Sequence, residues 1–179
     1  MVTIIHGGHR QGLCYDAAKV FEKMLAEKNV DVKFYSLRDH HFDYCCGDQP
    51  CQESGECIFN DVVVNEIIPS VAASDALVFF TPTYFNMPPA VLKNFLDRCN
   101  LLLTMEERKH PKFAAWVSEQ TEESSLEDCY RNLRVFADIC EFESIESGKI
   151  LRVETELTNT KTTTTDSEIL EELTTKIID

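Results

Sequence analysis

Two features that would point to a membrane are missing from this 179-residue sequence. It has no run of eighteen apolar residues, which a membrane-spanning helix would need. Its start, residues 1–6, lacks a basic segment followed by a long apolar stretch, so it does not resemble a signal peptide. We therefore expect a cytoplasmic protein with no membrane partner.

Basic residues are also scarce. The chain has 17 Lys and Arg against 31 Asp and Glu, and its formal net charge is −14. Nucleic-acid binding depends on Lys and Arg that neutralise phosphates, so we expect no nucleic-acid partner. A single bound phosphate is still compatible with this charge, because backbone N–H groups and a helix N-terminus can hold an anion locally.

Two glycine-rich nucleotide motifs are absent as well. The six glycines form neither Gly-x-x-x-x-Gly-Lys-Ser/Thr nor Gly-x-Gly-x-x-Gly. This argues against nucleoside triphosphate chemistry and against a Rossmann-type NAD site. The length suits one domain, so we expect residues 1–179 to form a single unit without internal repeats.

What the sequence does contain is a regular alternation of strand and helix patterns. Strands are predicted at residues 2–6, 30–37, 76–80, 112–118 and within 145–154. Helices are predicted at residues 15–27, 61–72, 89–102 and 126–140, and a last one carries Ile169, Leu170, Leu173 and Ile177. Pro69 is expected to bend or end the second helix, and Asp166 and Ser167 to cap the last one. Trp116, Cys99, Cys129 and Cys140 are expected in the core.

This order of elements indicates an α/β fold. Alternating strands and helices form a parallel sheet with helices on both faces. A doubly wound sheet of five strands in the order 2-1-3-4-5 suits the count.

The stretch after the third predicted strand is the most informative part of the chain. The apolar run 76–80 leads into a polar loop with aromatic residues. Pro88 and Pro89 then stop the strand and can open a helix, and apolar residues follow at helical spacing. In an open α/β sheet, ligands bind at strand ends of this kind.

This segment resembles the flavin-binding loop of the NADPH-dependent FMN reductase family, in the flavodoxin-like superfamily. That family reads small-Pro-x-Tyr-Phe-Gly-Ser-Met-Pro-Ala-x-Leu-Lys-x-Phe-x-Asp-Arg. Asn86 and Met87 replace its Gly-Ser, and Pro88 takes the place of its Met. The matching residues are Pro82, Tyr84, Phe85, Pro89, Ala90, Leu92, Lys93, Phe95, Asp97 and Arg98.

The loop at residues 7–15, between the first strand and the first helix, is a candidate phosphate site. A glycine-rich turn at a helix N-terminus can point several N–H groups at a phosphate, and Arg10 can pair with that phosphate. The family reads Gly-Ser-Pro-Arg-x-x-Gly-x-Thr here. Gly7 and Arg10 align directly, whereas Gly8 and His9 replace Ser-Pro.

The end of this motif can be aligned in two ways. Gly12 matches the family glycine if one residue is deleted, and Cys14 then stands at the position of the Thr. Without the deletion, Tyr15 stands there. In both alignments the threonine hydroxyl of the family, which resembles a phosphate ligand, is replaced by a different group.

The loop after the fourth strand departs most from the family. The family usually has a glycine-rich loop here that approaches the flavin ring, but residues 118–125 contain no glycine. Backbone without glycine approaches a ligand less freely. The segment can instead begin a helix early, with Ser118 or Thr121 as its cap.

A long segment at residues 38–60 carries four clustered cysteines. Iron–sulfur flavoproteins of this family hold a [4Fe–4S] cluster with Cys-x-x-Cys-x-x-Cys-x5-Cys at this place, but Asp48 stands at the second position. Free thiols, a cluster and another metal all remain open, and we favour free thiols because a cluster normally needs four thiolates. The candidate ligands are Cys45, Cys46, Cys51 and Cys57.

The resemblance implies an FMN-binding oxidoreductase in which electrons pass from NAD(P)H through FMN to a small acceptor such as a flavin, a quinone or a metal-bound substrate. It also implies a homodimer with the cofactor pocket near the subunit interface. No catalytic side chain is expected, because the flavin carries the chemistry. Two alternatives stay open: an iron–sulfur flavoprotein electron carrier, and a flavodoxin-like binding protein without enzyme activity. The implied cofactor-binding residues are Gly8, His9, Arg10, Gln11, Gly12, Cys14, Tyr15, Pro82, Thr83, Tyr84, Phe85, Asn86 and Ser118.

Overall fold

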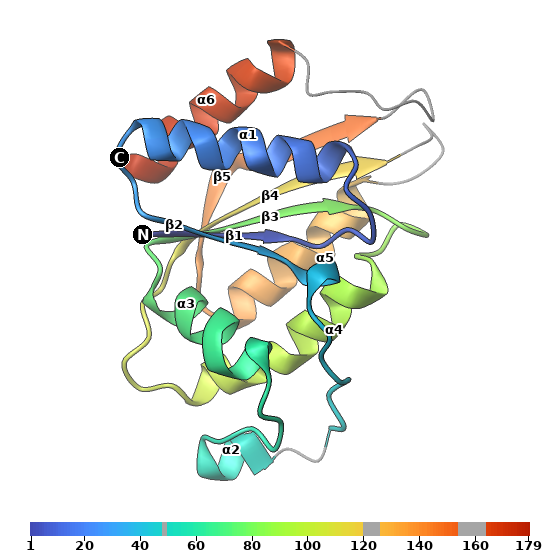
Figure 1. Ribbon diagram of the computed structural model, residues 1–179, viewed down its shortest axis with the longest axis vertical. Coiled ribbons are helices and arrows are strands. Elements are labelled where there is room, and N and C mark those ends of the chain that lie inside the picture. Colours follow the sequence, from blue (N-terminus) through green and yellow to red (C-terminus); the bar gives the residue numbers. More distant parts are fainter. Residues whose placement is uncertain (48–49, 120–125, 154–163) are drawn as a thin grey trace.

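Five parallel strands form one sheet in the order β2-β1-β3-β4-β5 (Figure 1). The computed structural model describes residues 1–47, 50–119, 126–153 and 164–179. The strands are β1 (Val2–His6), β2 (Val32–Ser36), β3 (Ala76–Pro82), β4 (Lys112–Glu119) and β5 (Glu143–Val153). The predicted strand order is therefore confirmed.

Helices cover both faces of this sheet. In Figure 1, α1 and α6 lie on one face, and α3, α4 and α5 lie on the other. A short helix, α2, projects beyond the second layer (Figure 1). The helices are α1 (Leu13–Glu27), α2 (Pro50–Ser54), α3 (Ile68–Ala73), α4 (Ala90–Arg98), α5 (Leu126–Ile139) and α6 (Thr164–Ile178).

Neighbouring residues of the inner strands pack against the helix layers on opposite faces of the sheet. Val78 and Trp116 pack in the cluster under α1 and α6, whereas Phe79 and Phe113 pack in the cluster under α3, α4 and α5. Parallel strands buried on both faces explain why the strand sequences are apolar without alternation. The core positions predicted for Trp116 and for the cysteines at 99, 129 and 140 are confirmed, since all four side chains are buried.

Several predicted boundaries differ from the structure. The region predicted as one helix at 61–72 is a π-helical turn, Val63–Ile67, followed by α3. Pro69 lies in the first turn of α3, where a missing N–H costs least, so the backbone changes type just before it. α4 ends at Arg98 and continues as the 3₁₀ segment Cys99–Thr104.

Two further predictions need correction. α6 begins at Thr164, so Asp166 and Ser167 lie within its first turn and do not precede it as caps. The cysteine-bearing segment is also not wholly a loop. It begins within the 3₁₀ turn Leu37–Asp39 and contains α2, because a proline can open a short helical turn.

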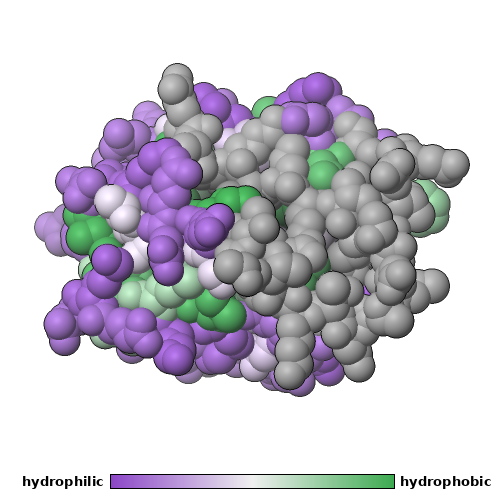
Figure 2. Space-filling model, turned by 90° about the horizontal axis from the view of Figure 1, so that it is seen from above, coloured by the Kyte–Doolittle hydropathy of each residue, from purple (hydrophilic) through white to green (hydrophobic). Residues whose placement is uncertain are grey.

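Where the residues are coloured in Figure 2, which looks down on the side of α1 and α6, the surface is mainly hydrophilic, with small hydrophobic areas between polar ones. This agrees with the excess of acidic residues in the chain. Among the described residues, no helix is both long enough and apolar enough to cross a membrane.

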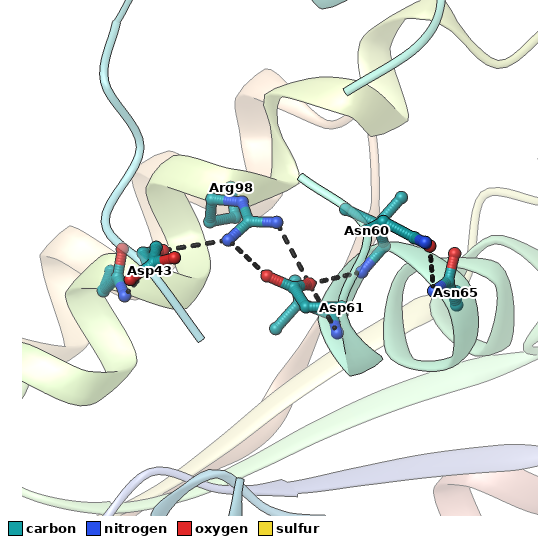
Figure 3. Close-up of polar contacts among 8 residues, drawn as sticks. Asp43, Asn60, Asp61, Asn65 and Arg98 are labelled. Carbon is teal, nitrogen blue, oxygen red and sulfur yellow. Dashed lines mark hydrogen bonds and ion pairs between the residues drawn. The ribbon is translucent and has the colours of Figure 1, made fainter. Parts of the chain in front are cut away.

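One buried arginine fastens both ends of the cysteine-bearing segment to α4. The Arg98 guanidinium donates to both carboxylate oxygens of Asp61, at 2.9 and 3.1 Å, and to the carbonyl oxygen of Asp43 at 2.9 Å (Figure 3). It also lies over the Phe59 ring, 4.3 Å from the ring centre. Asp43 precedes the cysteines and Asp61 follows them, so a single side chain closes the base of the segment.

We expect Arg98→Ala to lower the free energy of unfolding by about 3 kcal/mol, because removing one partner of a buried ion pair leaves the other uncompensated. Arg134→Ala is the matched control. It breaks an exposed pair with Asp138, so a change within about 0.5 kcal/mol is expected. Urea unfolding followed by circular dichroism measures both values. Equal effects of the two substitutions would contradict the anchoring role of Arg98.

Candidate functional site

A small hollow lies where three neighbouring strands end. β1, β3 and β4 are adjacent and parallel, so their carboxyl ends lie at one edge of the sheet (Figure 1). The segment predicted as the third loop lies mostly outside the described residues, which end at Glu119 here. The hollow has a volume of about 30 Å³, and His6 and Leu13 are part of its wall. The structure brings these predicted residues together around it: Gly8, Arg10, Gly12, Cys14, Pro82, Thr83, Tyr84 and Ser118.

The N-terminus of α1 faces this hollow. Gly12 is the N-cap of the helix and makes no side-chain capping bond, and Leu13 and Cys14 follow as its first residues. The first N–H groups of a helix lack partners within the helix and carry the positive end of its dipole. The hollow can therefore attract an anion through backbone groups, in spite of the negative charge of the whole chain.

The first loop lies too close to its neighbours for side chains at two positions. A Cβ atom on Gly7 would stand 2.7 Å from Leu92 of α4. A Cβ atom on Gly8 would stand 2.7 Å from Nε2 of His6 and 3.3 Å from Pro82. Glycine at both positions is what allows this loop to pack against β3 and α4.

His6 lines the hollow and was not found from the sequence. Its Nδ1 lies 3.0 Å from Oγ of Ser36, and the Tyr15 ring meets it edge-on at 5.3 Å. Burial lowers the pKa of His6 from 6.5 to about 4, while the charge of Asp39 raises it and that of Arg38 lowers it by smaller amounts. The sequence did offer one indication, because His6 is the last residue of a predicted strand and directly precedes two glycines.

The second loop is a tight two-residue turn. The backbone N–H groups of Tyr84 and Met87 each donate to the carbonyl oxygen of the other at 3.0 Å. The residues between them, Phe85 and Asn86, have φ angles of 51° and 62°. Such turns favour Asn-Gly, so phenylalanine is strained here, and strain of this kind is found mainly at functional sites. The Phe85 side chain is fully exposed, at 101%.

The third strand end joins the other two through Ser118. The N–H of Thr83 donates to the Ser118 carbonyl oxygen at 2.8 Å, and the Cys14 thiol lies 3.0 Å from the Ser118 hydroxyl. The proposed role of Ser118 as a helix cap is wrong, because its backbone pairs with Pro82 inside the sheet. Thr121, the other candidate cap, lies outside the described residues.

The two residues that the alternative alignments of the first loop place at the family threonine lie differently. Cys14 lines the hollow, whereas the Tyr15 ring packs between His6 and Phe34. The alignment that places Cys14 at the family threonine therefore fits the structure.

Four other predicted residues lie outside the wall of the hollow. His9 stacks on Tyr84 at 5.9 Å, and Gln11 is exposed in the first loop. The remaining two, Phe85 and Asn86, form the tip of the second loop.

A second and larger cavity, of about 560 Å³, lies between the cysteine-bearing segment, α4 and α5. Met87 and Pro88 also line it, so it begins where the second loop ends. No three His, Cys, Asp or Glu side chains of the described residues are grouped closely enough to hold a metal ion. The four clustered cysteines all line this cavity: Cys45, Cys46, Cys51 and Cys57.

The family of the chain follows from a comparison with known proteins. The family described as NADPH-dependent FMN reductase matches residues 1–151. The chain belongs to this family. The resemblance of its first two loops is thereby confirmed as a family relationship.

The curated relatives of this chain include iron–sulfur flavoproteins. One from Methanocaldococcus jannaschii is 35% identical over 75 residues, which are 41% of this chain and 38% of that protein. One from Clostridioides difficile is 26% identical over 125 residues, 66% of this chain and 54% of that protein. The chain thus matches about two fifths to one half of the length of these relatives.

Solved structures establish that the fold is flavodoxin-like. An FMN-dependent NADH-azoreductase from Bacillus anthracis, in complex with FMN, has a TM-score of 0.68 at 13% identity, covering 99% of both chains. A WrbA-like flavodoxin from Agrobacterium tumefaciens has a TM-score of 0.67 at 14% identity, covering 98% of this chain and 94% of that one. At such low identities these similarities concern the fold alone.

Burial of His6 predicts a pH-dependent stability. The unfolded chain binds a proton on this histidine below pH 6.5, whereas the folded protein does so only near pH 4. The free energy of unfolding that depends on His6 is therefore fully present above pH 6.5. It is lost as the pH drops toward 4, by about 3 kcal/mol in total. We expect His6→Asn to flatten the urea-unfolding profile across this range. Thr3→Val, which changes a buried hydroxyl on the same strand, should keep the wild-type slope. An unchanged slope in His6→Asn would contradict the assignment.

Proposed function

We propose that this protein is an FMN-dependent oxidoreductase that passes electrons from NAD(P)H to a small-molecule acceptor. The observation that carries the proposal is the hollow at the ends of β1, β3 and β4. It combines a helix N-terminus and an arginine with an exposed aromatic turn beside them. These parts match the two halves of FMN, an anionic phosphate and a flat apolar ring.

The phosphate half of the proposal rests on the first loop. The N-terminus of α1 and Arg10 surround the hollow, and both favour an anion. The buried imidazole of His6 also lines the hollow. The residues present therefore fit a phosphate group, and Gly8 and Gly12 add no side chains that would block it.

The ring half rests on the second loop. Tyr84 lines the hollow, while Phe85 at the tip of the turn is exposed and held at a positive φ. An exposed aromatic residue in a strained conformation suits contact with a flat ring. In this proposal Pro82 to Asn86 position the isoalloxazine ring beside the phosphate hollow.

Bound FMN would supply hydride and electron transfer, so the protein needs no nucleophile of its own. The azoreductase with the similar fold is described as NADH-dependent, and the family carries NADPH in its description. Either nicotinamide fits the proposal. We also propose a cytoplasmic location, where the eight cysteines would stay reduced.

A second candidate function is electron transfer by an iron–sulfur flavoprotein. It is favoured by the four clustered cysteines that line one cavity next to Met87. We still expect no [4Fe–4S] cluster, since Asp48 replaces the second cysteine of the motif. Iron and acid-labile sulfide analysis after anaerobic purification tests this. Near four irons per chain would establish electron transfer as the function and overturn our expectation.

We also propose that the chain forms a homodimer through the side that carries the larger cavity. Large hydrophobic side chains are exposed around it, including Ile58, Leu103, Val135 and Ile139. A second copy would cover them and would lie next to the second loop, near the ring site. Sedimentation velocity at micromolar concentration is expected to give a dimer for the wild type and a monomer for Ile139→Glu. A monomeric wild type would contradict this arrangement.

The colour and affinity of the purified protein test the main proposal. We expect a yellow protein with a flavin spectrum, or a colourless one that turns yellow on loading with FMN. Arg10→Ala should weaken FMN binding by about 1.5–3 kcal/mol, the scale of a hydrogen bond to a charged group. Arg131→Ala, which removes an exposed arginine on α5, should leave it unchanged. Flavin fluorescence titration gives these affinities. A protein that cannot be loaded would favour the binding-protein alternative.

A further inference from the structure

The larger cavity has the size and the lining of a small-molecule site. Its volume is about 560 Å³, and sites for small organic ligands usually measure about 300–1,000 Å³. α4 and α5 contribute apolar side chains to its wall, among them Leu96, Val135 and Ile139. The cysteine-bearing segment contributes Ile58 and Phe59. A flat organic ring can therefore bury most of its surface here.

The cysteines add to this apolar character. Cys99 and Cys140 line the cavity together with the four clustered cysteines. Burial raises the pKa of the Cys140 thiol to about 11 and that of the Cys99 thiol well above its ordinary value, so both thiols are uncharged at neutral pH. An uncharged thiol packs as a small apolar group. The cysteine-bearing segment can thus form the wall of an apolar site without binding a metal.

The charges on the wall balance each other. Its charged side chains are Lys93 and Asp97, one turn apart on α4, and they pair with each other at 2.5 Å. The next cation along this helix, Arg98, is bound to Asp61. The described wall of the cavity therefore has no unpaired cation for a phosphate, and the net charge of −14 repels anions from the whole chain. An uncharged ligand fits this wall, whereas a free phosphate-bearing flavin does not.

The cavity also adjoins the proposed ring site. Met87 and Pro88, at the end of the second loop, line it. The backbone of Met87 is paired with that of Tyr84, which lines the hollow. A ligand in the cavity would therefore lie beside the loop that positions the isoalloxazine ring, which is where an electron acceptor has to bind.

We propose that this cavity binds the electron acceptor, and that the acceptor is an uncharged, flat and apolar ring compound, such as a fully substituted benzoquinone. This inference rests on the proposed function, and it excludes free flavin phosphates as acceptors. In the overall reaction NAD(P)H gives up a hydride and the solvent gives one proton. The acceptor gains these two electrons and two protons, so its two C=O groups become C–OH groups and oxidised NAD(P) is released.

Protection of the cysteines from alkylation tests this site without measuring turnover. The protein is first loaded with FMN, and its flavin spectrum verifies the loading. Iodoacetamide is then added with or without tetramethyl-1,4-benzoquinone, whose ring has no free position for thiol addition, and mass spectrometry follows each cysteine. At a probe concentration of ten times its dissociation constant, Cys51 and Cys57 should react about tenfold more slowly. Free FMN at the same concentration should leave both rates unchanged.

A variant that fills the cavity provides a matched comparison. Val135→Trp places a larger side chain on the wall at α5 and should abolish the protection, while FMN loading stays normal. Ile169→Trp adds the same side chain at an exposed position of α6, on the other face of the sheet, and should keep the protection (Figure 1).

Several results would overturn the inference. If the probe gives no protection in the FMN-loaded protein, or if Val135→Trp keeps the protection, the acceptor does not bind in the cavity, and the proposed function survives. Equal protection by free FMN would show that the cavity does not select uncharged ligands. Cysteines that react slowly before any probe is added would show that a second copy of the chain already fills the cavity. A protein that cannot be loaded with FMN would remove the proposed function and this inference together.

Discussion

The structure depends on a close contact between the first loop and the layer behind it. Without side chains at Gly7 and Gly8, this loop reaches Leu92 of α4 and the imidazole of His6. The N–H of Gly7 also donates to the Phe80 carbonyl oxygen at 2.9 Å, which continues the pairing of β1 with β3. The start of α1 is thereby held above the strand ends, so a helix N-terminus, a strand end and an aromatic turn share one hollow.

Much of this arrangement could be predicted from the sequence because it follows from local patterns. Apolar runs such as Ala76–Pro82 specify buried parallel strands, and their alternation with helices specifies the strand order. His6 could not be recognised in this way. In the sequence it is one polar residue at a strand end, and only the packing shows that it is buried beside the hollow. The positive φ angles of Phe85 and Asn86 were hidden for the same reason, since neither residue requires them.

The cysteine-bearing segment illustrates a different limit. Its cysteines suggested chemistry, but the residues that position it lie outside the motif. Arg98 binds Asp43 and Asp61 on either side of the cysteines (Figure 3). The second loop directly precedes α4, and Arg98 is the last residue of that helix. Met87 and Pro88, at the end of the second loop, line the larger cavity. One helix therefore links the two candidate sites, and a partner or acceptor in the cavity would lie next to the ring.

A crystal structure of the protein grown with FMN tests the central claim most directly. The account predicts the phosphate in the hollow at the N-terminus of α1, near Arg10, with the ring against Tyr84. A flavin bound in the cavity lined by the four clustered cysteines, with the hollow holding no phosphate, would contradict it.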